Sequence, residues 1–218
     1  MSAEPVAVWS REPGGRRGTH LVVLLHGHGS HEEDLMGLVP GLPDEYTYVS
    51  VRAPLALAQG GYTWFDLDIE RLAYRSDEAR DAVMALGAWI DEISPGHSSV
   101  TLLGFSMGMA MATSLVRSRP EAFAAVVGLS GFAVAPAGES EVEEIFDAHK
   151  LAAVQVPLFW GRDQDDPVIP PENIEYTLNW ARDHVKLTKV LYAGAGHGVV
   201  PQEVSHVGEF LQYILGRS

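Results

Sequence analysis

The amino-acid sequence predicts an α/β protein with a mostly parallel central sheet and helices on both of its faces. Short apolar segments alternate along the chain with longer segments in which apolar residues recur every three or four positions. The run THLVVLL at 19–25 is almost continuously apolar, as expected for a strand that is buried on both faces of a sheet. We expect the whole chain, 1–218, to form one domain, because no repeat or long linker divides it.

The first 68 residues contain three predicted strands. They cover 5–10, 19–25 and 46–52. Between the second and the third of these strands, Ser30 and Glu33 have the spacing of a capping box, so we expect a short helix through Leu35 and Leu38. The stretch 53–68 is rich in glycine and aromatic residues and is predicted to be a loop.

From Ser76 onward the alternation continues. We expect Ser76 to cap a long helix. Its apolar residues share one face: Ala79, Val83, Leu86, Ile90 and Ile93. A predicted strand over 98–105 leads into a helix that Pro120 ends. The remaining strands are expected at 122–130, 156–160 and 186–194. The remaining helices are expected at 170–184 and 201–215. The segment 132–155 is expected to form a short helix near the functional site.

The composition excludes several classes of function. A formal net charge of −14 repels nucleic acid and disfavours contact with anionic membrane surfaces. The chain has no cysteine, which excludes disulfides and a thiolate nucleophile. Its first ten residues do not read as a signal peptide, and no stretch approaches the roughly 20 apolar residues of a membrane span. We therefore expect a cytoplasmic protein without stable membrane association, either a monomer or a homodimer.

The most specific motif is G-x-S-x-G at 104–108, which lies between a predicted strand and a predicted helix. In that context Ser106 occupies a tight turn that exposes its hydroxyl above the sheet. The helix that follows directs the partial positive charge of its N-terminus toward the reaction centre. The alternative is that Ser106 only caps this helix. The strand–turn–helix context favours a nucleophilic serine.

A serine nucleophile needs a base, and the base needs an acid that orients it. After this motif the expected chain order is Ser, then Asp or Glu, then His, each in a loop that follows a strand. The loop after the sixth predicted strand offers Asp163, Asp165 and Asp166, and the loop after the seventh offers His197 between two glycines. This order predicts His197 as the base and leaves the three aspartates open as the acid.

These segments together resemble the phospholipase/carboxylesterase family of small α/β-hydrolases, which includes carboxylesterases and acyl-protein thioesterases. The segments that carry the resemblance are LLHGHGSHEEDL, YTWFDL, GFSMG, DPVIP and AGHGVVPQEV. The resemblance implies an α/β-hydrolase fold without a large cap domain. It also implies Asp166 as the catalytic acid, because the family places this aspartate directly before a Pro-Val-x-Pro-like stretch. Asp163 is the next candidate, and the acids without this role are expected to be solvated loop charges.

The family resemblance also implies an oxyanion hole made of two backbone N–H groups, those of His28 and Met107. Ester cleavage places negative charge on the former carbonyl oxygen, which fixed N–H groups stabilise. The family more often has an apolar residue in place of His28 and glutamine in place of Met107. Because both roles use the backbone, neither departure threatens the mechanism.

Three histidines, His26, His28 and His31, lie within six positions and raise the alternative of a metal site. The oxyanion loop explains the same segment, so no metal ligands are predicted. In this interpretation His26 is a structural residue that bonds to nearby backbone, and His31 is an exposed residue at the start of a helix.

Aromatic and methionine side chains near the motifs are candidates for the substrate pocket. Trp64 and Phe65 either contact the substrate or anchor their loop to the core. Met107, Met109 and Met111 are candidates for lining an acyl pocket, although core packing is favoured for Met111.

The sequence thus predicts a serine hydrolase that cleaves small-molecule carboxylic esters with short to medium acyl chains, through Ser106, Asp166 and His197 and an acyl-enzyme intermediate. No cofactor is expected. An acyl thioesterase or a lysophospholipase with the same triad is the alternative. Two further alternatives are a metal-dependent hydrolase built on the three histidines and a hydrolase-like binding module. A binding module has no need of an intact triad.

Overall fold

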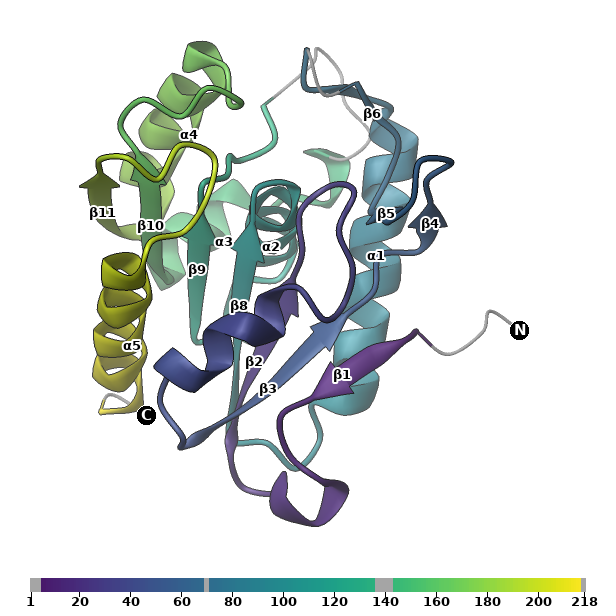
Figure 1. Ribbon diagram of the computed structural model, residues 1–218, viewed down its shortest axis with the longest axis vertical. Helices are drawn as coiled ribbons and strands as arrows, with labels where there is room; N and C mark the ends of the chain where they lie inside the picture. The colour runs from purple at the N-terminus through teal and green to yellow at the C-terminus, as the bar shows by residue number, and fades with distance from the viewer. Residues whose placement is uncertain (1–4, 69–70, 136–142, 217–218) are drawn as a thin grey trace.

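The computed structural model of the protein describes residues 5–68, 71–135 and 143–216. In these residues, seven strands form one sheet in the order β1-β3-β2-β8-β9-β10-β11 (Figure 1). The first strand runs antiparallel to its neighbour and the other pairs are parallel. The strands are β1 Ala7–Trp9, β2 His20–Leu25, β3 Tyr46–Val51, β8 Ser99–Phe105, β9 Ala125–Leu129, β10 Pro157–Asp163 and β11 Lys186–Tyr192. The predicted parallel sheet is confirmed.

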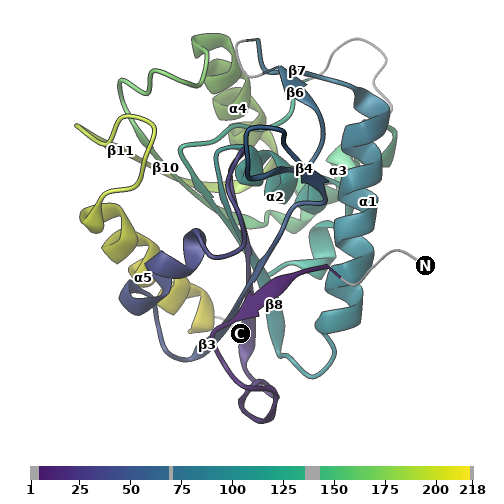
Figure 2. The ribbon, with the colours of Figure 1, turned by 45° about the vertical axis from the view of Figure 1, so that its right-hand side comes forward.

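Helices cover both faces of the sheet, as predicted (Figure 2). One buried cluster unites a face of the sheet with α1, α2, α3 and α4, and a second unites the other face with α5 and the 3₁₀ helix η2. The helices are α1 Ser76–Ile93, α2 Met107–Ser118, α3 Ala148–Val154, α4 Pro171–His184 and α5 Pro201–Leu215. The 3₁₀ helices are η1 Pro13–Gly15, η2 Leu35–Gly41, η3 Pro120–Ala122 and η4 Glu143–Ile145.

The strand order reverses at β2, which lies between β3 on one side and β8 on the other. Leu25, the last residue of β2, is paired with Gly104 of β8. The loop after β2 and the turn after β8 therefore leave the sheet side by side at its carboxyl end. In open α/β sheets this is where ligand sites form.

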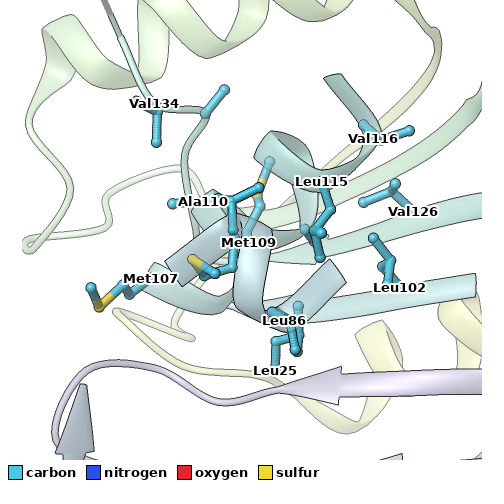
Figure 3. Packing of buried hydrophobic residues seen from close by; sticks show 14 of the residues in the cluster. Leu25, Leu86, Leu102, Met107, Met109, Ala110, Leu115, Val116, Val126 and Val134 are labelled. Atoms are coloured by element: carbon cyan, nitrogen blue, oxygen red, sulfur yellow. The ribbon is translucent and has the colours of Figure 1, made fainter. Parts of the chain in front are cut away.

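Helix α2 is buried from Met107 to Arg117, and its apolar side chains belong to the larger core cluster. Figure 3 shows Met109 and Ala110 in the middle of this cluster, Leu115 and Val116 farther along the helix, and Met107 at its edge. Because α2 is fixed on all sides, its first turn is a rigid support for the residues around it.

Two helix starts differ from the sequence prediction. Ser30 does not cap a helix: its hydroxyl donates to Asp34, and its backbone pairs with Tyr62. This pairing keeps Ser30 extended, so the helical turns of η2 begin only at Leu35.

Helix α1 begins at Ser76 itself, with Arg75 in the cap position. The predicted buried face of α1 is confirmed for Ala79, Val83, Leu86 and Ile90, while Ile93 is half-buried.

The segment predicted as a long loop contains short strands. These are β4 Leu55–Ala56, β5 Tyr62–Thr63 and β6 Leu67–Asp68, and β7 Ala73–Tyr74 follows beyond the predicted loop. They pair as two antiparallel ribbons, β4 with β5 and β6 with β7. β5 also bridges to Ser30, so this segment lies against the loop that follows β2.

Helix α3 lies in the segment expected to form a helix near the functional site, but it packs elsewhere. It contacts α4 and η3, and the Asp147 N–H before it donates to Arg117 near the carboxyl end of α2. This end of α2 is about 18 Å along the helix from Ser106. The part of the expected segment at 136–142 lies outside the described residues. Among the helices that are described, none is long and apolar enough to cross a bilayer.

Candidate active site

Ser106 occupies the turn between β8 and α2 with backbone angles φ 53° and ψ −118°. A non-glycine residue in this region is strained by about 1–3 kcal/mol, so the surroundings must hold it there. The Ser106 N–H donates to the Leu129 carbonyl at the end of β9, at 2.9 Å. The predicted strand–turn–helix context of the motif is present.

The two glycines of the motif are required by close packing. A Cβ on Gly104 would lie 2.2 Å from the backbone of Gly108, and a Cβ on Gly108 would lie 1.8 Å from the Leu25 carbonyl oxygen. Both distances are far inside van der Waals contact. The turn therefore closes only with glycine at these positions, and it brings Ser106 against the end of β2.

His197 lies between Ser106 and Asp166. Its Nε2 is 2.9 Å from Ser106 Oγ, and its Nδ1 is 3.0 and 3.2 Å from the two Asp166 carboxylate oxygens. A carboxylate only accepts, so Nδ1 carries the proton and Nε2 is free to accept from the serine hydroxyl. The structure thus brings together the three residues that were predicted as nucleophile, base and acid.

The Asp166 carboxylate is held from its own loop. Its side chain is fully buried, and one oxygen accepts from the backbone N–H groups of Val168 and Ile169, at 2.8 and 3.3 Å. Because Val168 and Ile169 belong to the Pro-Val-Ile-Pro stretch, the position of the aspartate directly before this stretch brings its carboxylate to both N–H groups.

Asp163 is not a solvated loop charge, contrary to the sequence expectation. It is buried and accepts from the backbone N–H groups of Asp165, Ala195 and Gly196. These backbone donors, that of Asp165 first, hold the pKa of the Asp163 carboxyl below its usual range. Asp163 therefore anchors the loop that carries His197, whereas Asp165 is exposed as expected.

Ser130 anchors the same loop from the other side, which the sequence did not indicate. Its hydroxyl donates to the Gly198 carbonyl at 2.9 Å, and its own backbone has a positive φ of 45° at the end of β9. Asp163 and Ser130 thus bind the residues immediately before and after His197.

The backbone donors predicted for the oxyanion hole lie at the two places where β2 and β8 end. Among the described residues, neither the His28 N–H nor the Met107 N–H donates to another protein group. Met107 is the first residue of α2, where helix N–H groups lack intrahelical acceptors. Two unsatisfied N–H groups near a serine are the donors that a developing oxyanion requires.

The three clustered histidines have different partners. His26 is fully buried and uses both ring nitrogens on backbone groups, those of Gly27 and Ala53. His28 bonds to Thr63, and the exposed His31 accepts from the Glu33 N–H. In the described residues no three histidine or carboxylate side chains are placed to hold a metal ion. The geometry gives no support to the metal-dependent alternative.

Trp64 and Phe65 are only 3% and 2% exposed. The Trp64 ring N–H donates to the His26 carbonyl at 2.9 Å, and its ring packs on the His26 imidazole. The structure therefore favours the anchoring role over direct substrate contact.

Met107, Met109 and Met111 are all fully buried, so core packing accounts for these three side chains.

The chain matches the Phospholipase/Carboxylesterase family over residues 11–215. It belongs to this family. The acyl-protein thioesterase 1 of Saccharomyces cerevisiae is 28% identical over 213 residues, which cover 88% of this chain and 91% of that protein. The predicted family membership and α/β-hydrolase fold are thereby confirmed.

Solved structures of related fold extend over nearly the whole chain. The Bacillus cereus carboxylesterase superposes with a TM-score of 0.78 at 18% identity, covering 98% of this chain and 96% of that one. Esterase PE8 superposes with a TM-score of 0.78 at 26% identity, covering 97% and 99%. This member of the phospholipase/carboxylesterase family therefore has a hydrolase fold, and its own substrate must be argued from its site.

Proposed function

We propose that this protein is a serine hydrolase that cleaves carboxylic esters with short to medium acyl chains. The observation that carries the proposal is the hydrogen-bonded series Ser106–His197–Asp166 at the carboxyl end of the sheet. Unsatisfied N–H groups on the adjacent loop and helix add a place for the oxyanion. Membership of the phospholipase/carboxylesterase family supports the same reaction class.

In the proposed reaction, Ser106 Oγ forms a bond to the ester carbonyl carbon while its proton passes to His197 Nε2. The carbonyl oxygen becomes negatively charged and accepts from the His28 and Met107 N–H groups. The carbon–alkoxy bond then breaks, and His197 gives its proton to the departing alcohol. Water attacks the acyl-serine in the same way, which releases the acid and restores Ser106.

A thioester substrate is the second candidate, favoured by the similarity to a protein named as an acyl-protein thioesterase. The same residues would act, with a thiol as the leaving group. The three methionines of α2 are buried in the core, so they line no exposed channel for a long acyl chain.

A matched pair of substrates tests the proposal. The p-nitrophenyl ester and a simple alkyl thioester of butyric acid present the same acyl group with different leaving groups. We expect hydrolysis of the ester, with activity lost in Ser106→Ala by a factor of about 10⁴–10⁶ in kcat. A higher kcat/KM for the thioester would assign the protein to the second candidate. A variant that keeps a tenth of the activity would show that Ser106 is not the nucleophile.

A further inference from the structure

Thr63, at the end of β5, contacts the side chains of both residues assigned to the proposed oxyanion hole. Its hydroxyl oxygen is 3.0 Å from His28 Nδ1 and 3.3 Å from Met107 Sδ. It is also 2.8 Å from the Phe65 carbonyl oxygen. Thr63 is only 2% exposed, so water does not compete for these contacts.

The single proton of the Thr63 hydroxyl fixes the roles in this group. A carbonyl oxygen at 2.8 Å is a far better acceptor than a thioether sulfur, so the proton is donated to Phe65. The hydroxyl lone pairs then accept from His28, whose proton must be on Nδ1. Burial lowers the pKa of His28, which favours the neutral ring, and the contact with Thr63 favours the tautomer with its proton on Nδ1.

The residues on either side of Thr63 bind the same loop. Tyr62 exchanges backbone hydrogen bonds with Gly29 and Ser30, at 2.9 and 2.8 Å. Trp64 binds the His26 carbonyl through its ring N–H. Three consecutive residues thus hold the loop after β2, and Thr63 also reaches Met107 on the first turn of α2.

We propose that Thr63 is a positioning residue that fixes the distance between the two backbone donors of the oxyanion hole. The inference rests on the function proposed above. The two donors lie on separate elements, the loop after β2 and helix α2, and Thr63 belongs to a third. Its hydroxyl orients the His28 side chain while its contact with Met107 keeps the loop against the helix.

Loss of this hydroxyl is expected to affect the transition state more than substrate binding. The oxyanion exists only as the reaction proceeds, so a loosened donor lowers kcat and leaves KM nearly unchanged. Complete removal of one such donor costs about 10²–10³ in kcat, and a donor that is present but less well placed should cost less. We expect kcat to fall about tenfold.

The test compares Thr63→Val, which keeps the shape and removes the hydroxyl, with Thr63→Ser, which restores it. Kinetics are measured on p-nitrophenyl butyrate, together with melting temperatures. Thr63→Val should lose about tenfold in kcat with KM changed less than about twofold, and Thr63→Ser should recover most of the loss. Thr113→Val is the matched control, because Thr113 is also buried and its hydroxyl bonds to the Met109 and Ala110 carbonyls within α2. It should retain the wild-type kcat.

A trifluoromethyl ketone gives a readout that a general structural defect does not produce. It is attacked by Ser106 to form a charged hemiketal, so its inhibition constant depends on the oxyanion hole. In Thr63→Val this constant should rise by the factor by which kcat/KM falls. The inhibition constant of the corresponding alcohol, which forms no oxyanion, should not change.

A second pair of variants tests the contact from the other side and does not require Thr63→Val to fold. His28→Leu removes the donor to Thr63, whereas His28→Asn keeps an N–H group near the position of Nδ1. We expect a kcat loss of similar size in the first variant and recovery in the second.

Several outcomes would overturn the inference. They are a wild-type kcat in Thr63→Val or His28→Leu, an equal loss in Thr113→Val, and a loss that Thr63→Ser does not restore. If the wild-type protein itself does not hydrolyse the ester or thioester, the proposed function fails and this inference fails with it. An active wild type with an unaffected Thr63→Val would refute the role of Thr63 alone.

Discussion

The Asp163 carboxylate accepts a 2.8 Å hydrogen bond from the backbone N–H of Gly196, the residue directly before His197. A second N–H, that of Ala195, binds the same carboxylate oxygen. Asp163 thus acts on the backbone of the histidine loop, while Asp166 acts on the imidazole itself. Two aspartates three positions apart have different tasks because one points at main chain and the other at a side chain.

Substitution of the two aspartates by asparagine should separate these tasks. Asp166→Asn keeps the shape but lets the amide favour the wrong imidazole tautomer, and the precedent in another serine enzyme is a fall of about 10⁴ in kcat. We expect a similar fall here. The melting temperature should change little, since the amide oxygen can still accept from Val168.

Asp163→Asn should lower both activity and the melting temperature. The amide retains one acceptor oxygen, and its NH₂ group would face backbone N–H donors that now lack a partner. Displacement of His197 by a fraction of an ångström to about 1 Å should reduce kcat by roughly 10–100-fold. The exposed Asp165→Asn is the matched control and should behave as wild type. A crippled Asp163→Asn beside a nearly normal Asp166→Asn would reverse our assignment of the acid.

Glu203, in the first turn of α5, is fully buried, and neither carboxylate oxygen has a hydrogen-bond partner among the described residues. The side chain lies against Gly161 of β10, where an added Cβ would be 2.1 Å from a Glu203 oxygen. Burial raises the pKa of Glu203 from 4.5 to about 7. In the folded protein this group therefore keeps its proton in a pH range where the unfolded chain has lost it.

The pKa of Glu203 predicts a loss of stability as pH rises. Between about pH 4.5 and 7 the folded state binds more protons than the unfolded state, so the free energy of unfolding falls by on the order of 3 kcal/mol. Glu203→Gln cannot ionise and should lack this contribution. Denaturation at pH 5 and pH 8 measures it: the variant should gain stability relative to wild type at the higher pH. A difference that does not change with pH would contradict the prediction.

Excess EDTA should leave the esterase activity unchanged. Both ring nitrogens of His26 bind backbone, His28 binds Thr63, and His31 lies at the surface, so the three side chains do not converge. Activity is measured after dialysis against the chelator. Loss of activity that added zinc restores would revive the metal-dependent hydrolase.

The sequence predicted the parts of this fold that depend on local pattern. Burial of β2 shows in its continuous apolar run, and burial of one face of α1 shows in apolar residues spaced three and four apart. Each pattern is present in the sequence of the segment itself. Ser106 and His197 were predicted as site residues because the strand–turn–helix motif and the glycines flanking the histidine are local features of the sequence. The choice of Asp166 relied on the family resemblance.

Other features depend on contacts between distant segments, which local pattern does not contain. Ser30 and Glu33 match a capping box in residue type and spacing, but pairing of Ser30 with Tyr62 keeps the backbone extended. In the sequence, Asp163 is one of three acids in the same loop. Only the folded structure brings the loop of His197 into contact with its carboxylate. Thr63 shows no signal beyond its place beside Trp64 and Phe65, since its partners His28 and Met107 lie 35 and 44 positions away.

The proposed function requires that Ser106 is a nucleophile activated by His197. Its most direct test is labelling with a fluorophosphonate probe, followed by mass spectrometry of the digested protein. We expect one probe per chain, on the peptide that contains Ser106, with loss of esterase activity in proportion to labelling. Ser106→Ala should remain folded and unlabelled. Labelling of another residue, or full activity in a protein whose Ser106 is fully labelled, would show that Ser106 is not the nucleophile.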